Sequence, residues 1–155
     1  SQTIGNAVGT VTVSSCFNST YDAYRVVVVG GTGSTTDGIA VGMAGGPGSG
    51  YYYGLVYATY ASTTVNANVN TNNGANWQFV GGTTAGQSSS FVFDLFNPFL
   101  SRYTTIHNGS YAGGLTAGTG NGYLAATTSF TGLVIAPQSG TLTGGTITIY
   151  GYRKG

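Results

Sequence analysis

Charged side chains are scarce in this 155-residue sequence. It has four Lys and Arg residues, three Asp residues, no Glu and one His, so charged residues make up 5% of the chain. A typical soluble domain has about 25%. Active sites and metal sites built from several carboxylates therefore have few residues to draw on. Four scattered cations also cannot form the basic patch that nucleic-acid binding requires. We expect no nucleic-acid partner, no metal and no other cofactor.

Cysteine, long apolar runs and helix-forming segments are also scarce. Cys16 is the single cysteine, so we expect no intramolecular disulfide and interpret its side chain as a small buried hydrophobe. The N-terminus has no basic start followed by an apolar run, and no run of about 18 apolar residues occurs, so we expect neither a signal peptide nor membrane insertion. Gly is frequent, with 28 residues, and no segment places good helix formers at a 3.6-residue spacing.

The residues that are abundant favour β-strands. Short runs rich in Thr, Val, Tyr, Ile and Phe are separated by Gly, Asn and Ser. This pattern predicts about eight to ten short strands in one antiparallel β-sandwich domain over residues 1–155, jelly-roll-like in arrangement, with residues 1–10 as a candidate N-terminal arm. The predicted strands are Val11–Val13, Tyr24–Val29, Ile39–Met43, Tyr51–Tyr60, Asn76–Val80, Phe91–Phe96, Tyr103–His107, Phe130–Ile135 and Thr146–Tyr150.

Several segments allow finer predictions. The four consecutive valines of Val26–Val29 predict a strand that is covered on both faces. Asp37-Gly38 favours a tight turn, because Gly accepts positive φ. Residues 45–50 predict a loop, and Asn70–Gly74 is rich in turn residues. Gly109–Thr128 is low in complexity, and we expect ordered but irregular loops there.

The uncharged composition also bears on assembly. A surface of Thr, Ser, Asn, Gly and Tyr costs less to desolvate than one of Lys and Glu. Tyrosine is suited to interfaces because its ring is amphipathic and has few rotatable bonds. We therefore expect a homo-oligomer, which is the ordinary way to hide strand edges and apolar faces.

The densest aromatic cluster follows the glycine-rich loop. Alternating tyrosines on a strand could form a stacking platform for sugars. The interpretation that we favour packs one face of the strand in the core and places the other against a neighbouring subunit. The candidate ligand or subunit contacts are Tyr51, Tyr52, Tyr53, Tyr57, Tyr60 and Trp77.

Catalytic interpretations have weaker support. His107, Ser110 and Asp94 can be written as a Ser-His-Asp triad, but no G-x-S-x-G turn marks a nucleophile. A depolymerase or esterase therefore stays as an alternative, and we predict that the chain is not an enzyme.

A glycosidase would need two carboxyl groups about 5 to 9.5 Å apart. Asp22 fits a strand entry and Asp37 fits a turn, whereas Asp94 could pair with Arg25 or Arg102. These structural roles account for all three acids of the sequence.

Two segments near opposite ends of the chain carry a resemblance. Phe17–Val28 contains Y-D-x-Y-R-V-V, and Gly140–Arg153 ends in T-G-G-T-I-T-I-Y-G-Y-R. They resemble the opening and ending of certain bacteriophage structural proteins, in which Asn-Pro also follows a hydrophobic strand, as Asn97-Pro98 does here. The resemblance implies a trimeric β-sandwich found as a minor structural, tail or head-associated protein. The chain differs from that group in its very low charge and in its Gly/Tyr-rich segment Ala44–Tyr60.

From the resemblance and the composition we expect a non-enzymatic virion protein, made in the bacterial cytoplasm. The most favoured role is a capsid-decoration or head-fibre module that forms a homotrimer and contacts other virion proteins such as the major capsid protein. Arg153 and Lys154 are candidate capsid anchors. The alternative is the receptor-binding tip of a tail fibre or a minor tail protein, which would bind a host surface glycan through Tyr51–Tyr60 and Trp77.

Overall fold

The computed structural model describes residues 1–113 and 116–153. These residues form 13 strands and no helix, and ten of the strands have five residues or more. In chain order the strands are β1 (Gln2–Thr3), β2 (Val11–Val13), β3 (Tyr21–Gly33), β4 (Asp37–Met43), β5 (Tyr51–Thr59), β6 (Val65–Gly74), β7 (Trp77–Thr83), β8 (Ser88–Phe96), β9 (Thr104–Gly113), β10 (Thr116–Leu124), β11 (Leu133–Pro137), β12 (Leu142–Thr143) and β13 (Thr146–Arg153).

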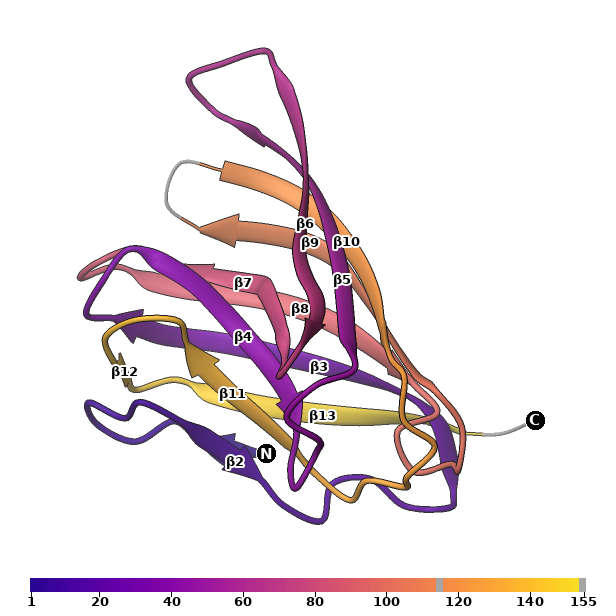
Figure 1. Cartoon of the computed structure of the whole chain (residues 1–155). Helices are drawn as coiled ribbons and strands as arrows, with labels where there is room; N and C mark the ends of the chain where they lie inside the picture. Colours follow the sequence, from indigo (N-terminus) through magenta and orange to yellow (C-terminus); the bar gives the residue numbers. More distant parts are fainter. Residues whose placement is uncertain (114–115, 154–155) are drawn as a thin grey trace.

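The strands form two antiparallel sheets. The larger sheet has the order β1-β13-β3-β8-β9-β10-β5-β6, with β12 also paired to β3, and the smaller has the order β2-β11-β4-β7. In Figure 1 the smaller sheet lies against one face of the larger one, and the β5–β6 and β9–β10 hairpins extend beyond it. The predicted antiparallel β-sandwich is therefore confirmed.

The strand order follows a jelly roll with additions. We take β2 to β8 and then β11 as eight successive strands. The smaller sheet then contains the first, eighth, third and sixth of them in order, and the larger contains the second, seventh, fourth and fifth. This order is that of a double-sheet jelly roll. The β9–β10 hairpin is inserted within the larger sheet, and β13 and β1 extend it beyond β3.

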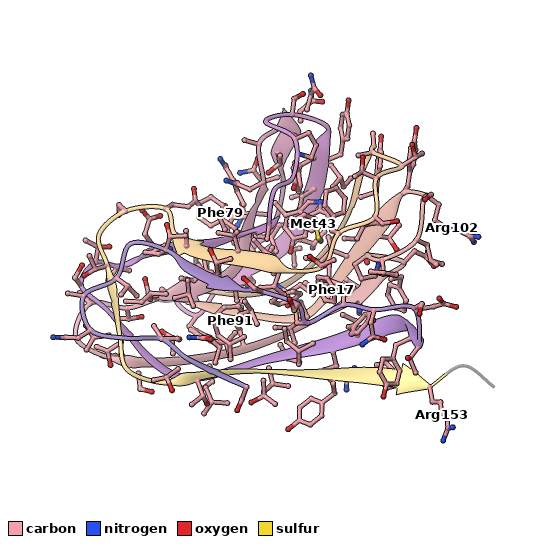
Figure 2. All side chains as sticks on the ribbon, turned by 90° about the horizontal axis from the view of Figure 1, so that it is seen from below. Phe17, Met43, Phe79, Phe91, Arg102 and Arg153 are labelled. Carbon is pink, nitrogen blue, oxygen red and sulfur yellow. The ribbon has the colours of Figure 1, made fainter. Side chains whose placement is uncertain are left out.

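The core lies between the sheets and follows the two-residue period of the strands. Val26 and Val28 of β3 and Phe93 of β8 face inward from the larger sheet, while Val41 of β4 and Ile135 of β11 face them from the smaller. Figure 2 shows Phe17 and Phe91 between the sheets and Arg102 and Arg153 at the periphery. The first ten residues lie along this sandwich, because β1 pairs with β13 and Ile4 is buried.

Two predicted turn or loop segments are strands instead. Asn70–Gly74 is the end of β6, which pairs with β5. Gly109–Thr128 contains the end of β9 and all of β10, and only its last four residues are irregular among those described. The glycines of β10 have a packing reason. A Cβ at Gly120 would collide with the Tyr53 ring, so the glycine makes room for that tyrosine.

The valine run is covered on one face only. Val26 and Val28 are buried, Val27 is half-buried and Val29 is 50% exposed. The prediction of a strand covered on both faces is therefore wrong for the single chain.

Candidate functional site

Half of the predicted aromatic site is part of the core. Tyr51, Tyr53 and Trp77 are at most 1% exposed. The Tyr51 and Trp77 rings meet edge to face with centroids 5.0 Å apart. The Tyr51 hydroxyl accepts a hydrogen bond from the Met43 N–H at 3.0 Å, and Trp77 Nε1 donates to the Tyr123 carbonyl at 3.2 Å. These three side chains therefore do not reach a ligand or a second subunit in this fold.

The burial of Tyr51 also affects its ionisation. Burial raises the pKa of the Tyr51 phenol, while the hydrogen bond from the Met43 backbone acts in the opposite direction. The phenol is thus held neutral in the core, where it satisfies a backbone donor of β4.

The other three tyrosines lie in different environments. Tyr57 is half-buried and packs against the core, whereas Tyr60 is 71% exposed after the end of β5. Tyr52 is half-buried on the face of the larger sheet that points away from the smaller sheet. We call this face the outer face.

Tyr52 belongs to a row of stacked rings that the sequence did not predict. The Tyr52 and Tyr123 rings are nearly parallel with centroids 4.8 Å apart, and Tyr103 stacks on the other side of Tyr123 at 5.9 Å. Tyr103 and Tyr123 are 52% and 40% exposed. One signal in the sequence could have indicated that Tyr123 faces outward, because it precedes Leu124 in a strand and alternate residues face opposite sides. Which rings lie next to Tyr123 depends on the register between strands, and composition does not predict that register.

Strand register places further side chains on the outer face, because directly opposed residues share a face. Two neighbouring rows cross the sheet from β13 to β5. The first row is Tyr152, Ala23, Phe96, Thr105, Tyr123 and Tyr52. The second row is Tyr150, Arg25, Asp94, His107, Asn121 and Gly54.

The ionised groups of these rows neutralise each other. Arg25 Nε and Nη2 donate to the two carboxylate oxygens of Asp94, each at 2.8 Å. This interaction raises the pKa of the Arg25 guanidinium above its ordinary value. Of the two partners considered for Asp94, the structure thus selects Arg25.

The same arrangement bears on the triad interpretation. His107 is exposed and lies opposite Asp94 in the β8–β9 register, while Ser110 is opposite Val92. Both oxygens of the carboxylate that a triad would use are bound by Arg25. Within residues 1–113 and 116–153, no group of three or more His, Cys, Asp or Glu residues is arranged to hold a metal ion.

The remaining acids have structural contacts. Asp37 begins β4, and its carboxylate accepts hydrogen bonds from the Gly38 N–H at 2.7 Å and the Ser139 hydroxyl at 2.6 Å. The predicted tight turn at Asp37-Gly38 is therefore wrong, because both residues belong to β4 and Gly38 does not have a positive φ; the bend before the strand falls at residues 34–36. The backbone carbonyl of Asp22, at the start of β3, accepts a hydrogen bond from the Asn97 N–H at 2.6 Å.

Exposed apolar side chains gather on the outer face. Phe96, Tyr123, Tyr150 and Tyr152 are between 40% and 58% exposed, and Val29 is 50% exposed. A shallow depression beside them is lined by residues 27–29 and 90–92, including the opposed pair Val27 and Val92.

Of the two predicted capsid anchors, Arg153 is exposed at the end of β13, and Lys154 lies outside the described residues. Cys16 is half-buried, and its thiol donates to the Val13 carbonyl at 3.4 Å.

No helix among the described residues is long and apolar enough to cross a membrane. Comparisons with protein-family models, curated proteins and solved structures found no match.

Proposed function

We propose that this chain is a non-enzymatic structural protein of a bacteriophage virion. Its most favoured role is a capsid-decoration or head-fibre module that forms a homotrimer and contacts the major capsid protein. The work of such a protein is done by subunit contacts, so its chemistry is the burial of Tyr, Phe and Val side chains.

One observation carries this proposal, namely an outer face with exposed apolar side chains and no net charge. Phe96, Tyr123 and Tyr150 are exposed there, and the Arg25–Asp94 pair has no net charge. Single exposed apolar residues are normal on a protein surface, but a contiguous patch of them commonly marks an interaction site. A protein that is incorporated into a particle has a use for such a face.

The two segments that resemble phage structural proteins supply a second line of support. Most of their residues lie in β3 and β13, which are hydrogen-bonded neighbours, with Arg25 opposite Tyr150 and Tyr24 opposite Gly151. A Cβ at Gly151 would come within 2.5 Å of the Tyr21 ring, so this position favours glycine. The resembling segments thus meet in one strand pair, as expected if they maintain a common fold.

A second candidate function is glycan binding, as expected of a receptor-binding tip. The row formed by Tyr52, Tyr123 and Tyr103 favours it, because exposed aromatic rings next to neutral hydrogen-bonding groups suit sugars. Asn121 and His107 are exposed in the adjacent row. The stacked rings cover each other's faces, so the free ring face for a sugar would be at an end of the row.

Immunogold labelling of phage particles that carry this gene product tests the proposal. We expect label on the head. Label confined to the tail tip would favour the glycan-binding role, and unlabelled particles would contradict both. A glycan array with Tyr103→Ala, and with Tyr60→Ala as a control at a more exposed tyrosine outside the row, separates sugar binding from assembly. Sugar binding that Tyr103→Ala abolishes and Tyr60→Ala retains would support the second function.

A further inference from the structure

We infer that the outer face of the larger sheet is covered by a second copy of this chain in the working assembly. This inference rests on the proposed structural role and specifies the partner and the surface. The interface would centre on the row from Tyr150 to His107 and on the adjoining valines Val27, Val29 and Val92.

The valine run provides the first argument. Four successive valines in β3 are the composition of a strand with both faces buried. In the single chain the smaller sheet covers Val26 and Val28, while Val27 is half-buried and Val29 is 50% exposed. The opposed residue of β8, Val92, is also half-buried. A second protein layer would complete the burial that this composition favours.

The absence of net charge on the face is the second argument, and it bears on which partner can cover it. The two carboxylate oxygens of Asp94 are each 2.8 Å from an Arg25 nitrogen, so the pair presents no net charge to a partner. A nucleic acid or a strongly charged protein surface would find no opposite charge there. A copy of the same neutral face meets no like-charge repulsion, and its tyrosine hydroxyls can both donate and accept hydrogen bonds.

The exposed area is the third argument. A whole aromatic side chain buries roughly 150–250 Å². With the observed exposed fractions, Phe96, Tyr103, Tyr123, Tyr150 and Tyr152 together present on the order of 500 Å². A standard interface takes about 800 Å² from each partner. The valines and the polar residues of the two rows can supply the remainder, so the face is large enough for a stable contact.

The geometry of the sheet allows more than one symmetry. Two copies can meet face to face across a two-fold axis, and three copies can turn the same face towards a three-fold axis. Either arrangement buries the outer face, and the measured mass distinguishes them.

Sedimentation equilibrium of the whole chain, over a wide concentration range, tests the inference. Val92→Lys and Tyr150→Lys each place a charge on the outer face. Thr12→Lys is the matched control, because Thr12 is exposed on β2 of the smaller sheet between buried Val11 and Val13. We expect the wild type and Thr12→Lys to form the same oligomer. The two outer-face variants should raise the dissociation constant by at least about tenfold, because an unpaired charge is desolvated at the contact.

Three results would overturn the inference. They are a wild type that stays monomeric at the highest concentration, outer-face variants that associate like the wild type, and a neutral oligosaccharide that binds the face and keeps the chain monomeric. Tyr150 is 58% exposed, so Tyr150→Lys is expected to keep the wild-type circular dichroism even if Val92→Lys does not. Its melting temperature is compared with that of the wild type at a dilution where both are monomeric, because association itself raises the melting temperature.

The outcome is distinguishable from a failure of the proposed function. A monomeric chain that still labels phage heads would remove the inference and leave the virion role. An oligomer that depends on the outer face, together with unlabelled particles, would support the inference and contradict the virion role.

Discussion

At the scale of the residue, glycine and tyrosine are matched in size between neighbouring strands. Gly120 and Gly122 of β10 lie beside the tyrosines of β5, and a Cβ at either position would collide with that strand. Tyr53 can therefore be 1% exposed in the core even though its strand continues past the smaller sheet. The glycine content of β10 reflects packing, which is why its low complexity was misleading.

Gly120→Ala tests this match. The added methyl group would contact the Tyr53 hydroxyl and ring, so we expect the free energy of unfolding to fall by about 2 kcal/mol. Gly48→Ala is the control, since no atom lies within 4 Å of the Cβ position there. Urea unfolding measures both variants, and equal stabilities would contradict the packing account.

Cys16 gives a prediction about pH. Burial raises the pKa of its thiol from 9.0 to about 11. A raised folded-state pKa stabilises the protein below the unfolded value, and this stabilisation is lost as the pH rises through about 11. Relative to Cys16→Ala, the free energy of unfolding of the wild type should fall by about 1 kcal/mol as the pH rises from the unfolded to the folded pKa of the thiol. This figure is reduced for solvent screening, because the group is only half-buried.

Urea unfolding at pH 8 and pH 11 measures this difference between the two proteins. The titration of Tyr51, whose pKa burial also raises, is common to both and cancels. The pKa of Tyr24 is raised by burial and also by its interaction with Cys16, so its contribution to the difference arises from the same thiol. A stability difference that is constant with pH would show that burial does not perturb the Cys16 thiol.

At the scale of the element, β9 is linked to the smaller sheet by a buried amide. Asn108 is 0% exposed, its Nδ2 donates to the Val80 carbonyl of β7, and its backbone carbonyl accepts a hydrogen bond from the Thr119 hydroxyl at 2.6 Å. Through Val80 this side chain ties the inserted β9–β10 hairpin to the edge of the smaller sheet.

Asn108→Ala should therefore destabilise the fold by about 2 kcal/mol, because the buried Val80 carbonyl loses this donor. Asn121→Ala on β10 is the control, since Asn121 is exposed on the outer face of the single chain, and both variants are compared at a dilution where the chain is monomeric. Thermal unfolding followed by circular dichroism compares the two. An Asn108→Ala melting temperature equal to that of Asn121→Ala would show that the link contributes little.

The elements also show what the sequence could predict. Alternation predicted the strands and the burial of alternate tyrosines in β5, because the two-residue period is local. It did not predict β6 or β10, whose residues Val65–Gly74 and Thr116–Leu124 have weak strand propensity and depend on pairing with β5. The row of Tyr103, Tyr123 and Tyr52 was missed for the same reason. Register between strands that are distant in sequence decides which side chains meet.

At the scale of the whole molecule, one sheet face is buried by the fold and the other is left uncovered. The uncovered face carries most of the exposed large hydrophobic side chains among the described residues, and its Arg25–Asp94 pair is self-neutralised. The low charge of the chain, the valine run of β3 and the tyrosines of β13 are thus explained together if copies of the chain share this face.

Tyrosine-selective chemical labelling, read by mass spectrometry at increasing protein concentration, tests that claim most directly. Tyr123, Tyr150 and Tyr152 are 40–58% exposed in the single chain, so they should be labelled when the protein is dilute. The account predicts that they become protected as the concentration rises, while Tyr60, beyond the end of β5, stays reactive and Tyr51 stays unlabelled throughout. Labelling of Tyr123, Tyr150 and Tyr152 that is unchanged at every concentration would contradict it.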